Sequence, residues 1–196
     1  MSTTLYADKP HKTEFDQDPY KVPVFSLRNK GRRFLWNAVW WLLCRWTPRP
    51  MHFWRVFVLR LFGAKIGRKN AVYPSATIWA PWLLETEDTV TIGPGVEVYN
   101  PGGAYLGHHS IVSQNAYLCG ATHDYNSANF DYVKRRITLE PYAWICARAV
   151  VLPGVTCRTG SVLGALSVAS RDLEAWTVYA GNPCARVKAR TNFTVA

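Results

Sequence analysis

The residues best suited to chemistry in this sequence are His123 and Asp124, in the stretch YLCGATHDYN (117–126). A histidine exchanges protons near neutral pH and also binds metal ions. A neighbouring carboxylate could orient its ring, although residues adjacent in a strand point to opposite sides. The pair therefore fits a catalytic base, a metal ligand or a polar pair in a turn, and the surrounding elements must decide between these.

The cysteines add little to this chemistry. The chain contains five of them: Cys44, Cys119, Cys146, Cys157 and Cys184. An odd number without a CxxC pair argues against a disulfide scaffold and a zinc ribbon, and it fits a reducing compartment. We expect Cys119 to line a site as a small side chain rather than to act as a nucleophile.

The positive charge is concentrated in the N-terminal part of the chain. Residues 1–70 contain 14 lysines and arginines against 4 acidic residues, whereas residues 71–196 contain 9 of each. A neutral body predicts no nucleic-acid groove. Residues 1–22 are polar and mixed in charge, with no apolar signal sequence, and we expect them to form a polar tail.

Residues 23–64 form a basic, tryptophan-rich arm. Pro48 and Pro50 interrupt it, so the pattern predicts two short helices, near 30–46 and 51–62. Its apolar run of 11 residues is shorter than the ~20 that span a bilayer. The aromatic residues would pack on the protein itself or a neighbouring subunit, or they would lie on a membrane surface with cations toward lipid phosphates. The candidate cations are Arg28, Lys30, Arg32, Arg33, Arg45 and Arg49.

From residue 65 a period of six replaces the helical pattern. The longest run is Leu139, Ile145, Val151, Cys157, Leu163 and Ala169, with small or medium residues in the fifth places, Ala143, Ala149, Val155, Ser161 and Ser167. Earlier runs are Ile66, Val72, Ile78, Leu84 and Val90, then Ile92 and Val98, then Leu106, Val112 and Leu118. This period matches neither a helix nor a flat strand. It predicts a triangular coil in which short strands stack in parallel, the leading residues pointing inward.

Two breaks limit this solenoid, which we place at residues 65–181. The period fails between His123 and Ile137, which predicts a loop at 124–136. Asn182 and Pro183 read as an N-cap and a first helical residue. We therefore expect residues 182–196 to form a C-terminal helix and tail that cover the open end of the coil.

The hexads, ATHD (121–124) and AGNP (180–183) together resemble the hexapeptide-repeat acyltransferases. Over residues 25–190 the chain is most similar to the colanic acid biosynthesis acetyltransferases of that superfamily, through the N-terminal block WNAVWWLLCRWTPRPMHFWRVFVLRLFGAKIG, YPSATIWAPWLLE, VEVYN and WTVYAGNP. The resemblance implies a mainly β fold, a left-handed parallel β-helix with an N-terminal helical arm. It also implies a homotrimer with sites between subunits, acetyl-CoA as co-substrate and no metal.

The resemblance also implies roles for individual residues. His123 would be the general base that deprotonates the acceptor hydroxyl, and either Asp124 or a backbone carbonyl would hold its second ring nitrogen. The acceptor-site candidates are Asn100, Tyr125, Asp131, Tyr132, Trp79 and Trp82. The candidates for binding coenzyme A are Trp144, Ala147, Ala165, Arg171, Arg186 and Lys188. Some relatives carry serine at the position of Ala147, so here backbone N–H groups or another donor must stabilise the oxyanion.

The expected function is transfer of an acetyl group from acetyl-CoA to a sugar hydroxyl in exopolysaccharide or surface-glycan biosynthesis. The enzyme would be cytoplasmic, at the inner face of the membrane if the arm binds lipid. Serine and antibiotics are alternative acceptors, and a non-catalytic scaffold is a further alternative. A γ-class carbonic anhydrase would need three histidines around zinc; His108, His109 and His123 are available, but position 128, where a further histidine would be expected, is Ala.

Overall fold

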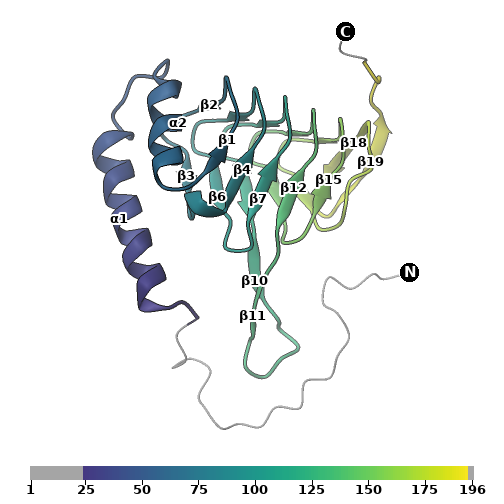
Figure 1. Ribbon diagram of the computed structural model, residues 1–196. Coiled ribbons are helices and arrows are strands. Elements are labelled where there is room, and N and C mark those ends of the chain that lie inside the picture. The colour runs from purple at the N-terminus through teal and green to yellow at the C-terminus, as the bar shows by residue number, and fades with distance from the viewer. Residues whose placement is uncertain (1–23, 194–196) are drawn as a thin grey trace.

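The computed structural model describes residues 24–193, in which two helices precede a stack of short parallel strands (Figure 1). The expected polar tail at 1–22 lies outside the described residues. The helices are α1 (Leu27–Leu43) and α2 (His52–Leu61), which confirms the predicted pair. Helix α1 begins at Ser26, whose hydroxyl accepts a hydrogen bond from the N–H of Asn29 at 3.3 Å.

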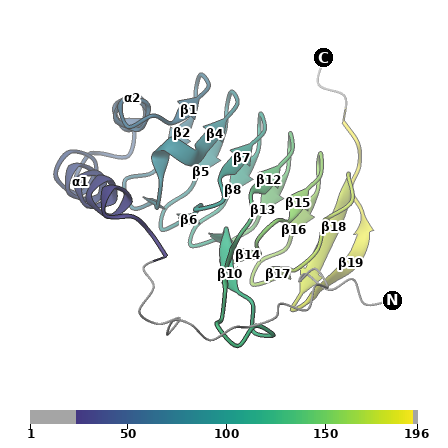
Figure 2. The same cartoon turned by 60° about the horizontal axis from the view of Figure 1, so that its bottom comes forward.

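Helix α1 is fixed to the first coil of the solenoid by two tryptophans. Trp36 and Trp40 are buried, and their indole N–H groups donate to the carbonyl oxygens of Ile78 (2.7 Å) and Ala76 (3.0 Å). These bonds satisfy the one polar atom of each large apolar side chain. Both helices therefore lie against the N-terminal end of the stack, where they cover the first coil (Figures 1 and 2).

The solenoid has three faces, each a sheet of parallel strands. Face A contains β1 (Lys65–Ile66), β4 (Leu84–Thr86), β7 (Ala104–Leu106), β12 (Ile137–Leu139) and β15 (Thr156–Cys157). Face B contains β2 (Ala71–Val72), β5 (Thr91–Ile92), β8 (Ile111–Val112), β13 (Trp144–Ile145), β16 (Val162–Leu163), β18 (Thr177–Gly181) and β19 (Cys184–Ala189). Face C contains β3 (Thr77–Ile78), β6 (Glu97–Tyr99), β9 (Tyr117–Cys119), β14 (Val150–Val151) and β17 (Val168–Ala169). The chain passes through the faces in the order A, B, C in each coil, which confirms the coil predicted from the hexads.

The core is built from ladders of inward-pointing side chains, one residue per coil. On face B, Val72, Ile92, Val112, Ile145 and Leu163 are in register and no more than 1% exposed. Each aliphatic side chain buried in this way contributes roughly 1.5–3 kcal/mol. The small fifth residues of the hexads are also buried, at the corners, as the spacing predicted.

The first run of hexads is interrupted earlier than the spacing predicted. The residue in register with Ile66 on face A is Thr86, and Leu84 lies two positions before it. The short 3₁₀ helix η1 (Pro81–Leu83) causes this shift, because it inserts residues between faces C and A. Leu84 and Val90 are still buried, so the step of six continues in burial but not in register.

The prediction of a C-terminal helix is wrong. Strand β19 pairs antiparallel with β18, so the chain reverses at residues 181–184 and adds an edge strand to face B. Gly181, with φ of +104°, allows this reversal at little steric cost. An Asn–Pro pair fits a turn as well as a helix start, and here the turn gives the edge of β18 a backbone partner.

The predicted break after His123 is a hairpin that leaves the corner between faces C and A (Figures 1 and 2). Strands β10 (Ala121–His123) and β11 (Tyr132–Lys134) pair antiparallel at its base, with His123 directly opposite Tyr132. The hairpin therefore includes His123, whereas the sequence placed this residue at the end of a coil.

Candidate functional site

His123 is exposed at the outer end of strand β10. Its Nδ1 lies 2.6 Å from the carbonyl oxygen of Phe130, across the hairpin. A carbonyl can only accept a hydrogen bond, so Nδ1 carries the proton in the neutral ring and Nε2 has the free lone pair. This is the tautomer in which the exposed imidazole can take a proton from a substrate through Nε2.

Asp124 does not hold the ring of His123. Its Oδ1 accepts a hydrogen bond from the N–H of Asn126 at 2.9 Å, and its own N–H donates to the carbonyl of Asp131. The carboxylate thus closes a turn of the hairpin loop. Of the two alternatives for the second ring nitrogen, the structure shows the backbone carbonyl.

Tyr132 supports the other side of His123. The two rings lie edge to face with centroids 5.5 Å apart. The hydroxyl of Tyr132 lies 2.9 Å from that of Tyr99, so one donates to the other. Burial and this hydrogen bond raise the pKa of Tyr132 above its usual range, which keeps the phenol neutral.

A wall of aromatic rings continues from Tyr132 toward helix α1. Phe25 contacts both Tyr132 and Trp79, with centroids 5.4 and 5.1 Å apart. Trp79 also meets Tyr99 edge-on at 5.6 Å, and the guanidinium of Arg33 lies 4.5 Å from its ring centroid. The structure therefore brings Trp79 and Tyr132 into one group with His123, and it adds Phe25, Arg33 and Tyr99, which the sequence analysis did not identify.

Four other acceptor candidates are placed differently. Asn100 is 1% exposed, and its amide bonds the backbone N–H and C=O of Ala80, which gives it a structural role. Asp131 accepts a hydrogen bond from the hydroxyl of Ser127 at 2.7 Å within the hairpin loop. Tyr125 is 63% exposed in the same loop. Trp82 carries the guanidinium of Arg32 at 3.9 Å, away from this group.

The candidates for coenzyme A form a separate surface on the later coils. Trp144, 42% exposed on face B, donates through its indole N–H to Ser113 at 2.9 Å. Ala147 and Ala165 follow paired strands β13 and β16 at the corner between faces B and C, and the carbonyl of Ala147 accepts from the N–H of Leu166. The two alanines carry small side chains, and the exposed side chain of Leu166 (68%) follows Ala165 at this corner.

The predicted phosphate-binding cations lie near the C-terminal end of the stack. Arg171 follows β17, and Arg186 and Lys188 stand on β19 rather than on a helix. All three are exposed. They belong to the same end of the molecule as Ala165, but the hairpin with His123 leaves from a different corner.

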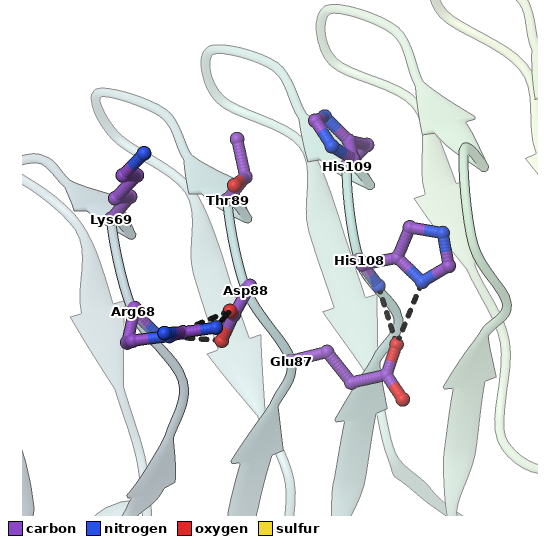
Figure 3. A pocket seen from close by; sticks show the side chains of 7 residues that line it. All are labelled: Arg68, Lys69, Glu87, Asp88, Thr89, His108 and His109. Carbon is purple, nitrogen blue, oxygen red and sulfur yellow. Dashed lines mark hydrogen bonds and ion pairs between the residues drawn. The ribbon is translucent and has the colours of Figure 1, made fainter. Parts of the chain in front are cut away.

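A further pocket lies elsewhere on the described surface, at the corner between faces A and B (Figure 3). Glu87 accepts hydrogen bonds there from the backbone N–H (2.8 Å) and ring of His108 (3.1 Å), and Arg68 pairs with Asp88. Hydrogen bonds from Tyr105 and His108 lower the pKa of Glu87. The charges satisfy one another, so we assign this pocket a structural role.

The three histidines of the carbonic anhydrase alternative do not meet within this chain. His108 and His109 lie at the corner between faces A and B, where the ring of His109 stacks on Tyr142 at 5.1 Å. His123 lies on the hairpin at another corner. Among residues 24–193 no group of three or more His, Cys, Asp or Glu side chains is arranged to hold a metal ion.

The cysteines are all free thiols. Cys119 donates to the carbonyl oxygen of Ala121 at 3.2 Å, which ties the end of β9 to the start of the hairpin. Burial raises the pKa of Cys146, Cys157 and Cys184. A raised pKa disfavours the thiolate, the form that acts as a nucleophile.

No protein-family model matches the chain. WcaF of Escherichia coli K12, which is named as a colanic acid biosynthesis acetyltransferase, is 38% identical over 176 residues, covering 89% of this chain and 97% of that protein. The chain belongs to the WcaF family of acetyltransferases. Because the match covers nearly the whole of both chains, it includes the helical arm as well as the solenoid.

Two further relatives carry information on the donor and the acceptor. The galactoside O-acetyltransferase of Lactococcus lactis is 30% identical over 140 residues, 69% of this chain and 60% of that protein. A hexapeptide-repeat acetyltransferase of Vibrio cholerae, solved with acetyl-CoA, has a TM-score of 0.77 at 19% identity and covers 85% of this chain and 91% of that one. This last likeness shows that the WcaF-family chain has the hexapeptide-repeat fold.

Proposed function

We propose that this WcaF-family protein transfers an acetyl group from acetyl-CoA to a hydroxyl of a sugar, with His123 as the general base. The observation that carries the proposal is the position of His123. A backbone carbonyl fixes its Nδ1 proton, and an aromatic wall suited to a sugar ring begins beside it. The acetyl-CoA in the Vibrio structure and the galactoside O-acetyltransferase relative support the choice of donor and acceptor class.

The step needs no covalent enzyme intermediate. Nε2 of His123 takes the hydroxyl proton as the sugar oxygen forms a bond to the thioester carbonyl carbon. The carbon–sulfur bond then breaks, the acetyl group stays on the sugar, and the proton passes from His123 to the leaving thiolate of coenzyme A. The Phe130 carbonyl stabilises the imidazolium that forms between these events, because it accepts a hydrogen bond from the N–H at Nδ1.

The oxyanion of the tetrahedral intermediate needs a donor other than a side-chain hydroxyl at residue 147. Ala147 supplies none, so backbone N–H groups near the corner between faces B and C are the candidates. Trp144 would border the thioester end of the donor, and Arg171, Arg186 and Lys188 would bind its phosphates.

We further propose that the active unit is a homotrimer. His123 and the aromatic wall lie at the corner between faces C and A, whereas Ala147 and Ala165 lie at the corner between faces B and C. One chain thus presents the base and the donor surface at separate edges. Packing the hairpin of one chain against the donor surface of the next would unite them, and an exposed His123 is consistent with such an arrangement.

The first test is thiol release from acetyl-CoA by the full chain with a panel of acceptors. The panel contains sugar nucleotides, galactosides and glycan fragments, with serine and chloramphenicol as the alternative acceptors. We expect release that depends on a sugar. Release with serine or chloramphenicol alone would overturn the acceptor class, and a chain that does not bind coenzyme A would contradict the function.

A further inference from the structure

The outward face of helix α1 is apolar, although the helix is already held through its inward face. Trp36 and Trp40 point toward the solenoid. On the opposite side, at a spacing of about seven, large apolar residues are exposed. These residues, which we call the outer stripe, are Leu27 (84% exposed), Phe34 (78%), Leu35 (56%), Trp41 (56%) and Leu42 (62%).

Helix α2 carries a second exposed stripe next to the C-terminal end of α1. It consists of Phe53 (73% exposed), Phe57 (56%) and Leu61 (71%), spaced by four residues. Trp54 joins the two helices, since its indole N–H donates to the carbonyl of Leu43 and its ring lies 5.8 Å from that of Phe57. The exposed apolar surface therefore extends over both helices and does not belong to the core.

The charges around the outer stripe are all positive. Residues 24–84 contain no aspartate or glutamate. Arg32 and Arg33 are used to stack on Trp82 and Trp79, which corrects their expected place among the lipid-facing cations. Arg28, Lys30, Arg45 and Arg49 are exposed, and no carboxylate of residues 24–193 forms an ion pair with them.

We propose that the helical arm is a docking surface for an anionic membrane. Aromatic and leucine side chains flanked by unpaired cations and no acidic residue match the two requirements of such a surface, apolar insertion and attraction to acidic headgroups. No helix in the described part of the chain is long and apolar enough to cross a bilayer, so α1 lies along the lipid surface. A protein partner would need a large acidic and apolar patch, and the body of this chain offers a balanced charge instead.

The same helix also borders the proposed acceptor site. Arg33 of α1 stacks on Trp79, and Phe25, just before α1, contacts Tyr132. Docking of α1 would therefore hold His123 close to the membrane. If the proposed function is correct, the acceptor class this favours is a glycan carried on a membrane lipid, and this second step rests on that function whereas the docking does not.

The test is flotation of the full chain with vesicles of phosphatidylcholine alone and of phosphatidylcholine mixed with phosphatidylglycerol. We expect binding to the anionic vesicles that weakens at high salt, because surface charges are screened. The double variant Arg28→Glu with Arg45→Glu should bind at least about tenfold more weakly, at ~1 kcal/mol for each charge. Phe34→Ser with Trp41→Ser should lose binding to a similar degree.

Two control variants make single substitutions of the same two kinds on the solenoid, a charge reversal and an apolar residue replaced by serine. Arg148→Glu replaces an exposed arginine and Ile111→Ser a 40% exposed apolar residue, and neither should change vesicle binding. No binding to anionic vesicles, or equal loss in the controls, would overturn the proposal. So would arm variants that alter the oligomeric state but bind vesicles as the unmodified chain does, because the stripe would then be a subunit interface. The salt dependence of the unmodified chain tests the proposal even if a variant folds poorly, and none of these measurements depends on acetyl transfer.

Discussion

The ring of Tyr132 contacts His123 from the facing strand of the hairpin. It meets the imidazole edge-on at 5.5 Å and is itself tied to Tyr99 through the two hydroxyls. A base whose ring is held on two sides, by the Phe130 carbonyl and by an aromatic edge, spends more time in the orientation that reacts. We therefore regard Tyr132 as a positioning residue.

Replacing this ring should affect turnover more than donor binding. Aromatic pairs of this kind contribute about 0.5–1.5 kcal/mol, so Tyr132→Leu should lower kcat up to about tenfold with little change in the KM for acetyl-CoA. Tyr132→Phe keeps the ring and should recover most of the loss, at a cost in stability of about 1 kcal/mol for the hydrogen bond to Tyr99. Steady-state kinetics of both variants check this, and an unchanged kcat in Tyr132→Leu would refute the positioning role.

Individual site residues could be predicted from the sequence only where a motif fixed them. His123 was proposed by resemblance, and its partner was left open between Asp124 and a backbone carbonyl, because a backbone carbonyl leaves no trace in the side-chain pattern. The structural contact of Asn100 could not be predicted for the same reason: its polar side chain satisfies the backbone of Ala80 in the preceding coil. Phe25 and Arg33 lie far from His123 in the sequence, and only the folded arm brings them near the hairpin.

Among the elements, helix α2 is attached to the solenoid by a buried cation. Arg55 is fully buried and donates to the carbonyl oxygens of Val72 (2.6 Å) and Pro48 (3.0 Å) and to the hydroxyl of Thr47 (2.6 Å). Burial lowers its pKa. The side chain therefore ties the turn between the helices, at Thr47 and Pro48, to the first coil at Val72.

Arg55→Met should therefore destabilise the protein by about 3 kcal/mol, because several hydrogen bonds from a buried cation are lost at once. The same substitution at Arg60, an exposed residue of α2 that bonds the carbonyl of Ile66, should cost about 1 kcal/mol or less. Urea unfolding of the two variants measures the difference. Equal losses would show that the buried bonds do not hold the arm in place.

The charged residues at the corner between faces A and B give a prediction for acid conditions. The pKa of Glu87 is held below its ordinary value of 4.5 by hydrogen bonds from Tyr105 and His108, so the folded protein favours the ionised carboxylate. Its contribution is present above the unfolded pKa and is lost as the pH falls through the folded one. Glu87→Gln should reduce stability near pH 7 by less than about 1 kcal/mol, since the carboxylate is partly exposed.

The test is the free energy of unfolding of Glu87→Gln and of the unmodified chain, measured from neutral to acid pH. It shows whether the ionised carboxylate stabilises the fold. The two curves should converge as the pH falls through the folded pKa of Glu87, which lies below 4.5. Curves that separate further in acid would mean that the group is stabilised in its protonated form, contrary to the hydrogen bonds seen here.

Sequence patterns predicted the elements unequally. Six hexads in succession specified the later coils, because each inward residue has one place on one face. The first coils were less regular, since η1 shifts the register by two residues. The C-terminal hairpin was missed because Asn182 and Pro183 are compatible with either a helix start or a turn, and the exposed edge of β18 decides in favour of a strand.

In the whole molecule, the neutral part and the basic part of the chain have different proposed roles. The neutral solenoid carries the proposed base and the proposed donor surface, while the basic arm closes one end of the stack and presents the outer stripe. The sequence left open whether this arm contacts a membrane or a protein. It could not show which tryptophans face inward, and this distribution leaves the aromatic and leucine residues of α1 exposed among cations.

The most direct test of the central claim is acetyl transfer by the full chain and by His123→Gln, with coenzyme A binding measured on the same preparations. Glutamine keeps a hydrogen-bonding side chain but cannot take a proton, so general-base catalysis of about 10²–10⁴-fold should be lost while coenzyme A affinity is unchanged. That result would assign the chemistry to His123. Turnover by His123→Gln within about threefold of the unmodified chain, with coenzyme A bound equally, would contradict the account and move the base elsewhere in the WcaF-family site.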